Sequence, residues 1–184
     1  LNTSGVIGSD VGTFSGGTRS GFFTWLHNKA ADGGTPLIGA LNAAGNYFTK
    51  DTPWRTNPAL ASSALLECRQ NFTILMTDGY YSDSSSVGDQ DSNNGAEITG
   101  PKAKTYTYLA ANPFKDGKGS TLADVAMKYW KTDLRPDLDN TVPFNGTNPA
   151  FWQHMVTFGV GLGVTGNVNS KTAFEAIDSG TAVD

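Results

Sequence analysis

The sequence has few charged residues, a single cysteine and no long hydrophobic run. Lys and Arg number 13 and Asp and Glu number 17 among 184 residues, which leaves a net charge of -4. A nucleic-acid-binding surface needs clustered basic residues, so this balance argues against a nucleic-acid partner. No apolar run reaches the roughly 18 residues that a membrane-spanning helix needs, so we expect no membrane span.

The one cysteine, Cys68, excludes a disulfide framework within the chain. It leaves two alternatives, a buried free thiol or a disulfide with a cysteine in sequence missing from this chain. The sequence does not begin with a charged segment followed by an apolar one, so we recognise no signal peptide. Low charge together with many Gly, Ser, Thr and Asn residues favours an extracellular location.

Glycine and aromatic residues are abundant instead. The chain has 22 Gly, and its 4 Trp, 10 Phe and 6 Tyr are enough to anchor a hydrophobic core. A chain of this length is typical of one domain, so we expect residues 1–184 to form a single domain.

Apolar periodicity predicts helices that alternate with strands. The clearest helix follows Ser120 or Thr121, where Thr121-x-x-Asp124 resembles a capping box, and it stops before Pro136. Further helices are expected over 19–28, 35–48, 61–68 and 171–177, and strands over 72–77 and 156–164. Between them, residues 80–119 are expected to form a long inserted loop.

The patterns also predict which faces are covered. Ile74-Leu75-Met76 is apolar without interruption, which predicts a strand covered on both faces. Residues 156–164 alternate bulky side chains with Thr and Gly, which predicts a bare face open to close packing. Phe174 and Ile177 of the last helix are expected to face the core.

Strands that alternate with helices predict an α/β fold. We expect a doubly wound, mostly parallel sheet with helices on both faces. Ligands of such sheets bind outside the carboxyl ends of the strands. Asp78 directly follows the strand at 72–77, and Thr35 at a helix start is expected to reach the same rim.

Several longer motifs, in one order, resemble the PilY/PilC-type proteins, which are type IV pilus assembly factors and tip adhesins. The similar part is their N-terminal von Willebrand factor A-like domain, and the likeness covers roughly residues 12–165. The motifs are Gly33-Gly-Thr-Pro-Leu37, Cys68-Arg-Gln-Asn71 running into Ile74-Leu-Met-Thr-Asp-Gly79, Leu122-Ala-Asp-Val-Ala-Met127, Tyr129-Trp-Lys-Thr-Asp-Leu-Arg-Pro-Asp137 and Trp152-Gln-His-Met-Val156 through Gly161-Leu-Gly-Val164.

The resemblance implies a von Willebrand factor A-like fold with a metal-ion-dependent adhesion site. In that site a divalent cation (Mg, Mn or Ca) is held by an Asp-x-Ser-x-Ser loop after the first strand, by a Thr and by a distant Asp. Thr35 matches the Thr and Asp78 matches the distant Asp. The segment nearest to the loop pattern, Asp83-Ser-Ser-Ser-Val87, fails at its last position and follows Asp78. We therefore expect the first strand to lie upstream of Leu1, which leaves the fold and the metal site incomplete.

The function implied by the resemblance is a non-enzymatic adhesion and assembly module at the pilus tip or outer membrane. It would bind a surface ligand or a minor pilin at the rim, through the cation. The alternative is a structural cap that packs on minor pilins without metal. A third alternative is a hydrolase that uses Asp78 and His154. The sequence argues against it, because the chain has only two histidines and no Gly-x-Ser-x-Gly motif.

Asp89-x-Asp91-x-Asn93 resembles the start of a calcium-binding loop. The EF-hand pattern requires Gly at position six and Glu at position twelve, where this sequence has Asn94 and Gly100. The sequence therefore leaves two alternatives for this segment: calcium binding by Asp89, Asp91 and Asn93, or a solvated loop.

Overall fold

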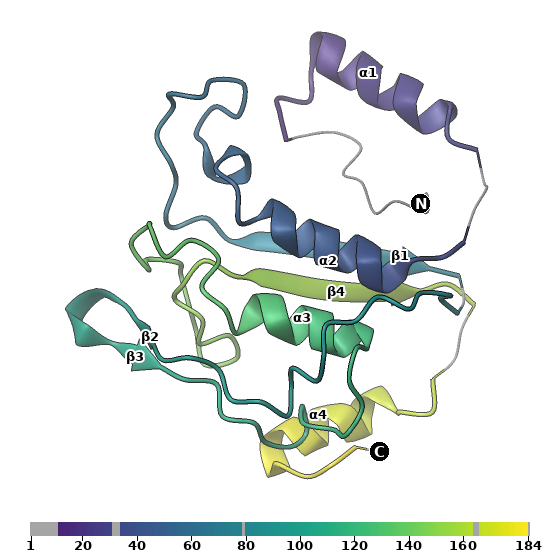
Figure 1. Cartoon of the computed structure of the whole chain (residues 1–184), viewed down its shortest axis with the longest axis vertical. Helices are drawn as coiled ribbons and strands as arrows, with labels where there is room; N and C mark the ends of the chain where they lie inside the picture. The colour runs from purple at the N-terminus through teal and green to yellow at the C-terminus, as the bar shows by residue number, and fades with distance from the viewer. Residues whose placement is uncertain (1–10, 31–33, 79, 164–165, 184) are drawn as a thin grey trace.

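The computed structural model describes residues 11–30, 34–78, 80–163 and 166–183. Within these ranges, no helix is long and apolar enough to cross a membrane. Figure 1 shows the helices, which are α1 (Gly16–His27), α2 (Leu37–Tyr47), α3 (Leu122–Trp130) and α4 (Ser170–Ser179). The strands are β1 (Asn71–Thr77), β2 (Ile98–Thr99), β3 (Thr105–Tyr106) and β4 (Met155–Gly161). Short 3-10 turns lie at Thr52–Trp54 and Pro101–Ala103.

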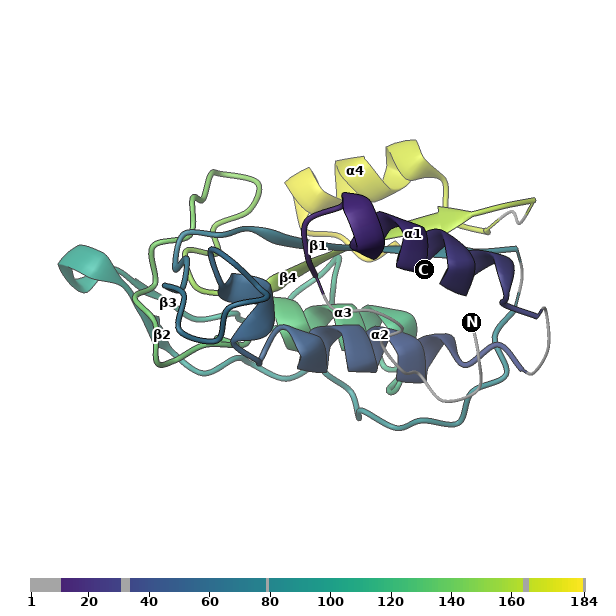
Figure 2. The ribbon, with the colours of Figure 1, turned by 90° about the horizontal axis from the view of Figure 1, so that it is seen from above.

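The central feature is a parallel pair of strands, β1 and β4. Their register runs from Asn71 opposite Met155 to Thr77 opposite Gly161. Both predicted strands are confirmed, except that β4 ends before Leu162 and that Val164 lies outside the described residues. Figure 2 shows α2 and α3 along one side of this pair and α1 and α4 on the other. A small parallel sheet with helices on both sides agrees with the α/β prediction.

The main core lies between α2, α3 and the sheet. The helix predicted over 35–48 is confirmed as α2, and its apolar stripe faces this core, with Leu37 and Leu41 fully buried. The predicted capping box of α3 is also confirmed: Asp124 N–H donates to Thr121 Oγ1 at 3.2 Å, and Thr121 N–H donates to Asp124 Oδ2 at 2.8 Å. The buried residues of this core are Ile38, Leu41, Val125, Tyr129, Leu134 and Met155.

Close approach of α2 to α3 depends on Gly45. A Cβ atom on this residue would lie 2.3 Å from Cδ2 of Tyr129, a distance at which the atoms overlap. The hydroxyl of Tyr129 then donates toward the side-chain oxygens of Asn42 and Asn46, each at 2.8 Å. The ring therefore fills the space that a larger residue at position 45 would need.

The opposite face of the sheet is exposed, which contradicts the prediction that β1 is covered on both faces. Ile74 is 65% exposed, and Phe72, Met76 and Phe158 on the same face are also exposed. Helix α1 has no buried residue and α4 has one, Ala176. An uninterrupted apolar run shows that a strand has two apolar faces, but it does not supply the elements that cover them.

One further packing prediction is wrong for the same reason, because Phe174 and Ile177 of α4 are exposed rather than turned into the core. The bare face of β4 is open at Gly159, where no atom of the described residues beyond its two chain neighbours lies within 4 Å of the Cβ position. Periodicity identifies an apolar or a bare face, while the partner of that face depends on tertiary structure.

Residues 61–68 form turns instead of the predicted helix. The backbone N–H of Leu66 donates to the carbonyl of Trp54 at 2.8 Å, and that of Thr56 donates to the carbonyl of Ala64 at 2.8 Å. An isolated antiparallel bridge joins Arg55 and Leu65. These longer-range bonds satisfy the backbone and outweigh a weak local preference for helix.

Residues 80–119 form the predicted long connection, with a short antiparallel hairpin of β2 and β3 near its middle. An aromatic cluster holds this hairpin to the rest of the chain. Tyr106 stacks on Trp152 with ring centroids 5.2 Å apart, and Trp152 Nε1–H donates to the carbonyl of Trp130 at 2.9 Å. The connection is therefore anchored at its hairpin.

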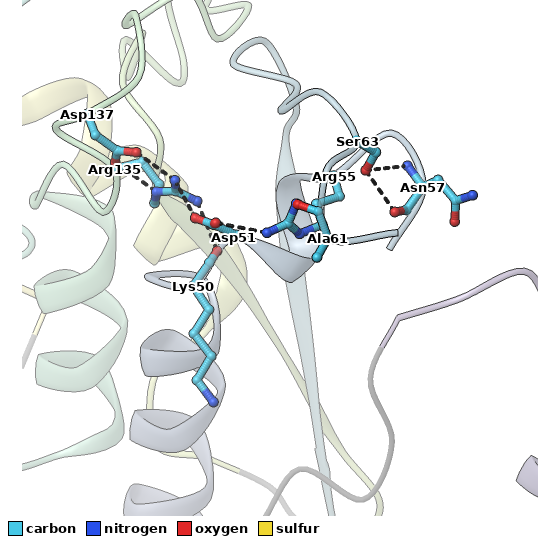
Figure 3. Close-up of polar contacts among 8 residues, drawn as sticks. All are labelled: Lys50, Asp51, Arg55, Asn57, Ala61, Ser63, Arg135 and Asp137. Carbon is cyan, nitrogen blue, oxygen red and sulfur yellow. Dashed lines mark hydrogen bonds and ion pairs between the residues drawn. The ribbon is translucent and has the colours of Figure 1, made fainter. Parts of the chain in front are cut away.

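A buried guanidinium joins the segment after α3 to the end of α2 (Figure 3). Arg135 is 3% exposed and donates to the carbonyl of Lys50 at 3.0 Å and to Oδ1 of Asp51 at 2.9 Å. It also contacts both oxygens of Asp137, at 2.9 Å from Nε and 2.7 Å from Nη2. Asp51 in turn pairs with Arg55 at 3.0 Å. This network fixes the start of the segment that leads toward β4.

Candidate functional site

The carboxyl-end rim of the sheet is the first candidate site. Figure 1 shows that α2 begins at the end of the molecule where β1 and β4 finish. Thr35 lies just before α2, and its backbone pairs with Ser82: Thr35 N–H donates to Ser82 Oγ at 3.4 Å, and Ser82 N–H donates to Thr35 O at 3.2 Å. The chain that leaves β1 therefore folds back onto the start of α2.

Asp83 makes the strongest contact between this returning chain and α2. Its Oδ2 accepts a 2.6 Å hydrogen bond from the backbone N–H of Gly39, and its Oδ1 accepts a 2.8 Å bond from Ser85 N–H. The bond from Gly39 is the main reason why the pKa of Asp83 is lowered. A carboxylate at this position also complements the partial positive charge of a helix amino end. Asp83 thus caps α2 from a distant part of the sequence.

Thr35 and Asp78, the two residues matched to the adhesion site, both belong to this rim. Asp78 directly follows β1 and is exposed. Between described residues, neither the Thr35 hydroxyl nor the Asp78 carboxylate takes part in a hydrogen bond or ion pair, so both oxygens are open to a ligand. Mg²⁺ prefers six oxygen ligands and keeps several waters where the protein supplies few. One hydroxyl and one carboxylate would supply only part of such a coordination shell, and metal binding by Thr35 and Asp78 stays a prediction.

A second candidate site lies where the 80–119 connection crosses α3. Carboxylate oxygens of Asp89, Asp91 and Asp124 all lie within 4.8 Å of one another. Asp89 and Asp91 come from the predicted calcium loop, and Asp124 comes from the first turn of α3. The side-chain amide of Asn93, the third predicted ligand, instead donates to the carbonyl of Asp89. The structure therefore places Asp124 beside the two predicted aspartates, and calcium binding by Asn93 stays a prediction.

Each carboxylate of the group is held by protein donors. Asp124 Oδ1 accepts from Gln90 N–H at 2.6 Å, and Asp89 Oδ1 accepts from Ser92 N–H at 2.9 Å. Asp91 is 1% exposed, and its Oδ1 accepts from Asp116 N–H at 3.1 Å. Burial, followed by the charges of the neighbouring carboxylates, raises the pKa of Asp91.

Sequence reasoning misses two residues of these sites. The sequence pattern identifies Asp124 only as the partner of Thr121 in a capping box. Asp124 does have that role in the structure. The pattern marks Asp83 only as the start of a failed match to the Asp-x-Ser-x-Ser loop. The capping box is a sequence signal for Asp124, because a carboxylate that caps a helix still has lone pairs with which to bind a ligand. Nothing in the local sequence indicates that residues 89–91 lie beside it.

Comparison with known proteins agrees with the resemblance found in the motifs. The chain is 38% identical over 177 residues to the type IV pilus biogenesis factor PilY1 of Pseudomonas aeruginosa strain PAK, and 37% identical over 177 residues to that of strain PAO1. The chain is a PilY1-type sequence. Each match covers 85% of this chain and 15% of the relative. No protein-family model and no solved structure matches the chain.

The PilY1-type chain thus spans about 15% of the length of the curated relatives it matches. The relative from strain UCBPP-PA14 shows the same relation, with 38% identity over 169 residues and 14% of its length covered. The likeness is therefore to one segment of each relative.

Cys68 of the PilY1-type chain is an exposed free thiol just before β1. Its exposure contradicts the alternative of a buried thiol. A disulfide with a cysteine in sequence missing from this chain stays a prediction.

His154 and Asp78, the pair that a hydrolase would need, lie at opposite ends of the sheet. His154 precedes β4, whereas Asp78 follows β1, and eight residue steps along the parallel strands separate them by about 26 Å at 3.3 Å per residue. His154 is buried, with Nδ1 at 2.7 Å from the carbonyl of Trp152 and Nε2 at 3.1 Å from Nδ2 of Asn148. Both ring nitrogens are thus engaged by protein groups, and burial lowers the pKa of the imidazole.

Proposed function

We infer that this PilY1-type segment is a von Willebrand factor A-like module of a type IV pilus biogenesis factor, which acts by binding rather than by catalysis. The relatives are named as type IV pilus biogenesis factors, which supports a role in making or presenting pili. A pilus-associated, extracellular location follows from the same proposal.

The proposed binding surface is the carboxyl-end rim beside the start of α2. The observation that supports it most is that Asp78 directly follows β1 and Thr35 lies just before α2, with their side-chain oxygens uncommitted among the described residues. A divalent cation held by these two oxygens would keep open coordination positions for water or for a carboxylate of the partner. The partner would be a minor pilin or a ligand on a surface.

A structural role without metal is the second candidate, and one observation favours it. The outer face of β1 and β4 exposes Phe72, Ile74, Met76 and Phe158 side by side. Contiguous exposed apolar side chains mark protein interfaces more often than isolated ones do. In this alternative, the sheet face packs on another pilus component and the rim is not used.

The two candidates are separated by substitutions in the complete pilus factor expressed in piliated bacteria. Asp78→Asn should abolish adhesion that is sensitive to EDTA and leave the number of surface pili unchanged. Asp178→Asn serves as the control, because Asp178 is an exposed acid on α4 and lies away from the rim.

Each outcome favours or contradicts one candidate. If Ile74→Ser lowers the number of pili while Asp78→Asn and EDTA have no effect, the structural role replaces the adhesion site. If Asp78→Asn leaves EDTA-sensitive adhesion intact, the rim is not its cation site. Calorimetry with Mg²⁺, Mn²⁺ and Ca²⁺ on the 184-residue chain, and on one extended upstream, adds a direct binding measurement for the same variants.

A further inference from the structure

We propose that Asp89, Asp91 and Asp124 bind one calcium ion, which fastens the 80–119 connection to the first turn of α3. This site is separate from the rim at Thr35 and Asp78, and its existence does not depend on the proposed adhesion function. It joins two residues of the irregular connection to one residue of a helix, and Asp91 and Asp124 are 33 positions apart in the sequence.

An unpartnered buried oxygen is the observation that points to a ligand. Asp91 is 1% exposed, and its buried Oδ2 has no hydrogen-bond partner among the described residues. A buried carboxylate oxygen left without a donor is costly, because it has lost its hydration without compensation. A cation within the group would supply what this oxygen lacks.

The charge balance of the site favours a divalent cation. Lys131 is the nearby base, but its Nζ donates to the carbonyl oxygens of Gln90 and Asn93. Among the described residues, no salt bridge joins Lys131 to any carboxylate of the group. Three carboxylates and one ammonium leave a formal charge of -2 when all are ionised, which one divalent ion would neutralise. The charge of Asp116 also acts on Asp91 and adds to the negative potential that attracts a cation.

The number of carboxylates favours calcium over magnesium. Ca²⁺ takes 6–8 oxygen ligands at 2.3–2.6 Å in flexible geometry, and carboxylate oxygens within 4.8 Å of one another can share one such ion. Mg²⁺ demands near-octahedral geometry and is usually held by only one or two carboxylates, so a group of three suits Ca²⁺ better. The group contains no His or Cys, which argues against zinc.

An approach from solvent is also present. Asp89 lines an open hollow of about 680 Å³, together with Gln90, Asn93 and Lys131. Asp91 and Asp124 do not line it and are buried. An ion entering through this hollow would meet Asp89 first and would then contact the two buried carboxylates. Calcium normally takes 6–8 oxygen ligands, so water and backbone carbonyls would complete its coordination.

The test uses CaCl₂ alone as the probe and the 184-residue chain as the protein. Isothermal titration calorimetry on Asp78→Asn, which removes the rim carboxylate, should detect one Ca²⁺ per chain, which separates this site from the rim. Adding Asp91→Asn to that chain should weaken this binding at least tenfold. Asp91→Asn keeps the size of the side chain and its Oδ1 acceptor, so it should remain folded by circular dichroism.

A second measurement guards against a variant that fails to fold. In the unchanged chain, Ca²⁺ should slow amide hydrogen exchange of residues 88–92 and of the first turn of α3, and MgCl₂ at the same concentration should do so less. The proposal is overturned if the unchanged chain binds no Ca²⁺ at millimolar concentration. It is also overturned if Asp91→Asn binds as tightly as the unchanged chain.

Discussion

The backbone N–H of Gly39 donates a 2.6 Å hydrogen bond to the Asp83 carboxylate, across 44 positions of sequence. This contact joins the chain that leaves β1 to the first turn of α2. A Cβ atom at Gly39 would lie 3.2 Å from Asp83 Oδ2, so glycine also leaves room for the carboxylate. The conformation of the proposed rim therefore depends on two residues that the family motifs do not include.

Replacing Asp83 should loosen this rim without unfolding the chain. In Asp83→Ala, the amide of Gly39 loses its acceptor and should exchange with solvent at least several-fold faster, as hydrogen exchange by NMR would report. The matched control is Asp178→Ala on α4. Unchanged exchange at Gly39 in Asp83→Ala would contradict the hydrogen bond.

Two methionines of the same sheet should differ in their response to truncation. Met155 is 0% exposed in the main core, whereas Met76 is 55% exposed on the outer face. Met155→Ala should lower the free energy of unfolding by about 2–5 kcal/mol, because it leaves a cavity. Met76→Ala should cost less than about 1 kcal/mol. Urea unfolding of both variants measures the difference, and equal losses would show that the outer face is covered in solution.

The pair of Arg135 and Asp137 should appear in the acid dependence of stability. The hydrogen bonds from Arg135 lower the pKa of Asp137 below its ordinary value of 3.8. The folded chain then binds fewer protons than the unfolded chain, so this stabilisation is complete above about pH 4 and is lost as pH falls through the lowered pKa. Urea unfolding at pH 6 and pH 3 should show a smaller loss for Asp137→Asn than for the unchanged chain.

The control for this experiment is Asp139→Asn in the same segment. Its carboxylate makes no hydrogen bond among the described residues, so this variant should keep the acid sensitivity of the unchanged chain. Arg135→Lys provides an independent check, since lysine cannot reproduce the two parallel bonds to Asp137. It should lower the free energy of unfolding by about 1–2 kcal/mol, because each lost charged hydrogen bond is partly replaced by water.

His154 should make stability fall at mildly acidic pH. Burial lowers its pKa below the ordinary value of 6.5, so the unfolded chain takes up a proton before the folded chain does. Its contribution to stability is therefore complete above about pH 6.5 and declines as pH falls through the lowered pKa. Urea unfolding at pH 7.5 and pH 5.5 should show this decline in the unchanged chain and in the exposed control His27→Gln. A decline of the same size in His154→Gln would exclude His154 as its source.

Local sequence determined the elements with strong internal signals. The Thr121–Asp124 box begins α3 because both of its hydrogen bonds form within one turn. The apolar stripe of α2 and the patterns of β1 and β4 were also sufficient, since each element buries one face against a neighbour. The likeness to PilY1-type factors was also evident from the sequence alone, because motifs are defined by the order of residues and do not depend on how the chain packs.

Tertiary structure decided what local sequence does not encode. Residues 61–68 became turns because their backbone pairs with residues 54–56, and the outer face of β1 is exposed because α1 and α4 do not cover it. Asp124 was predictable as a helix cap, but its position beside Asp89 and Asp91 depends on how the 80–119 connection crosses α3. Capping needs residues within one turn of each other, whereas a metal site needs carboxylates from distant segments to meet, and only packing brings those together.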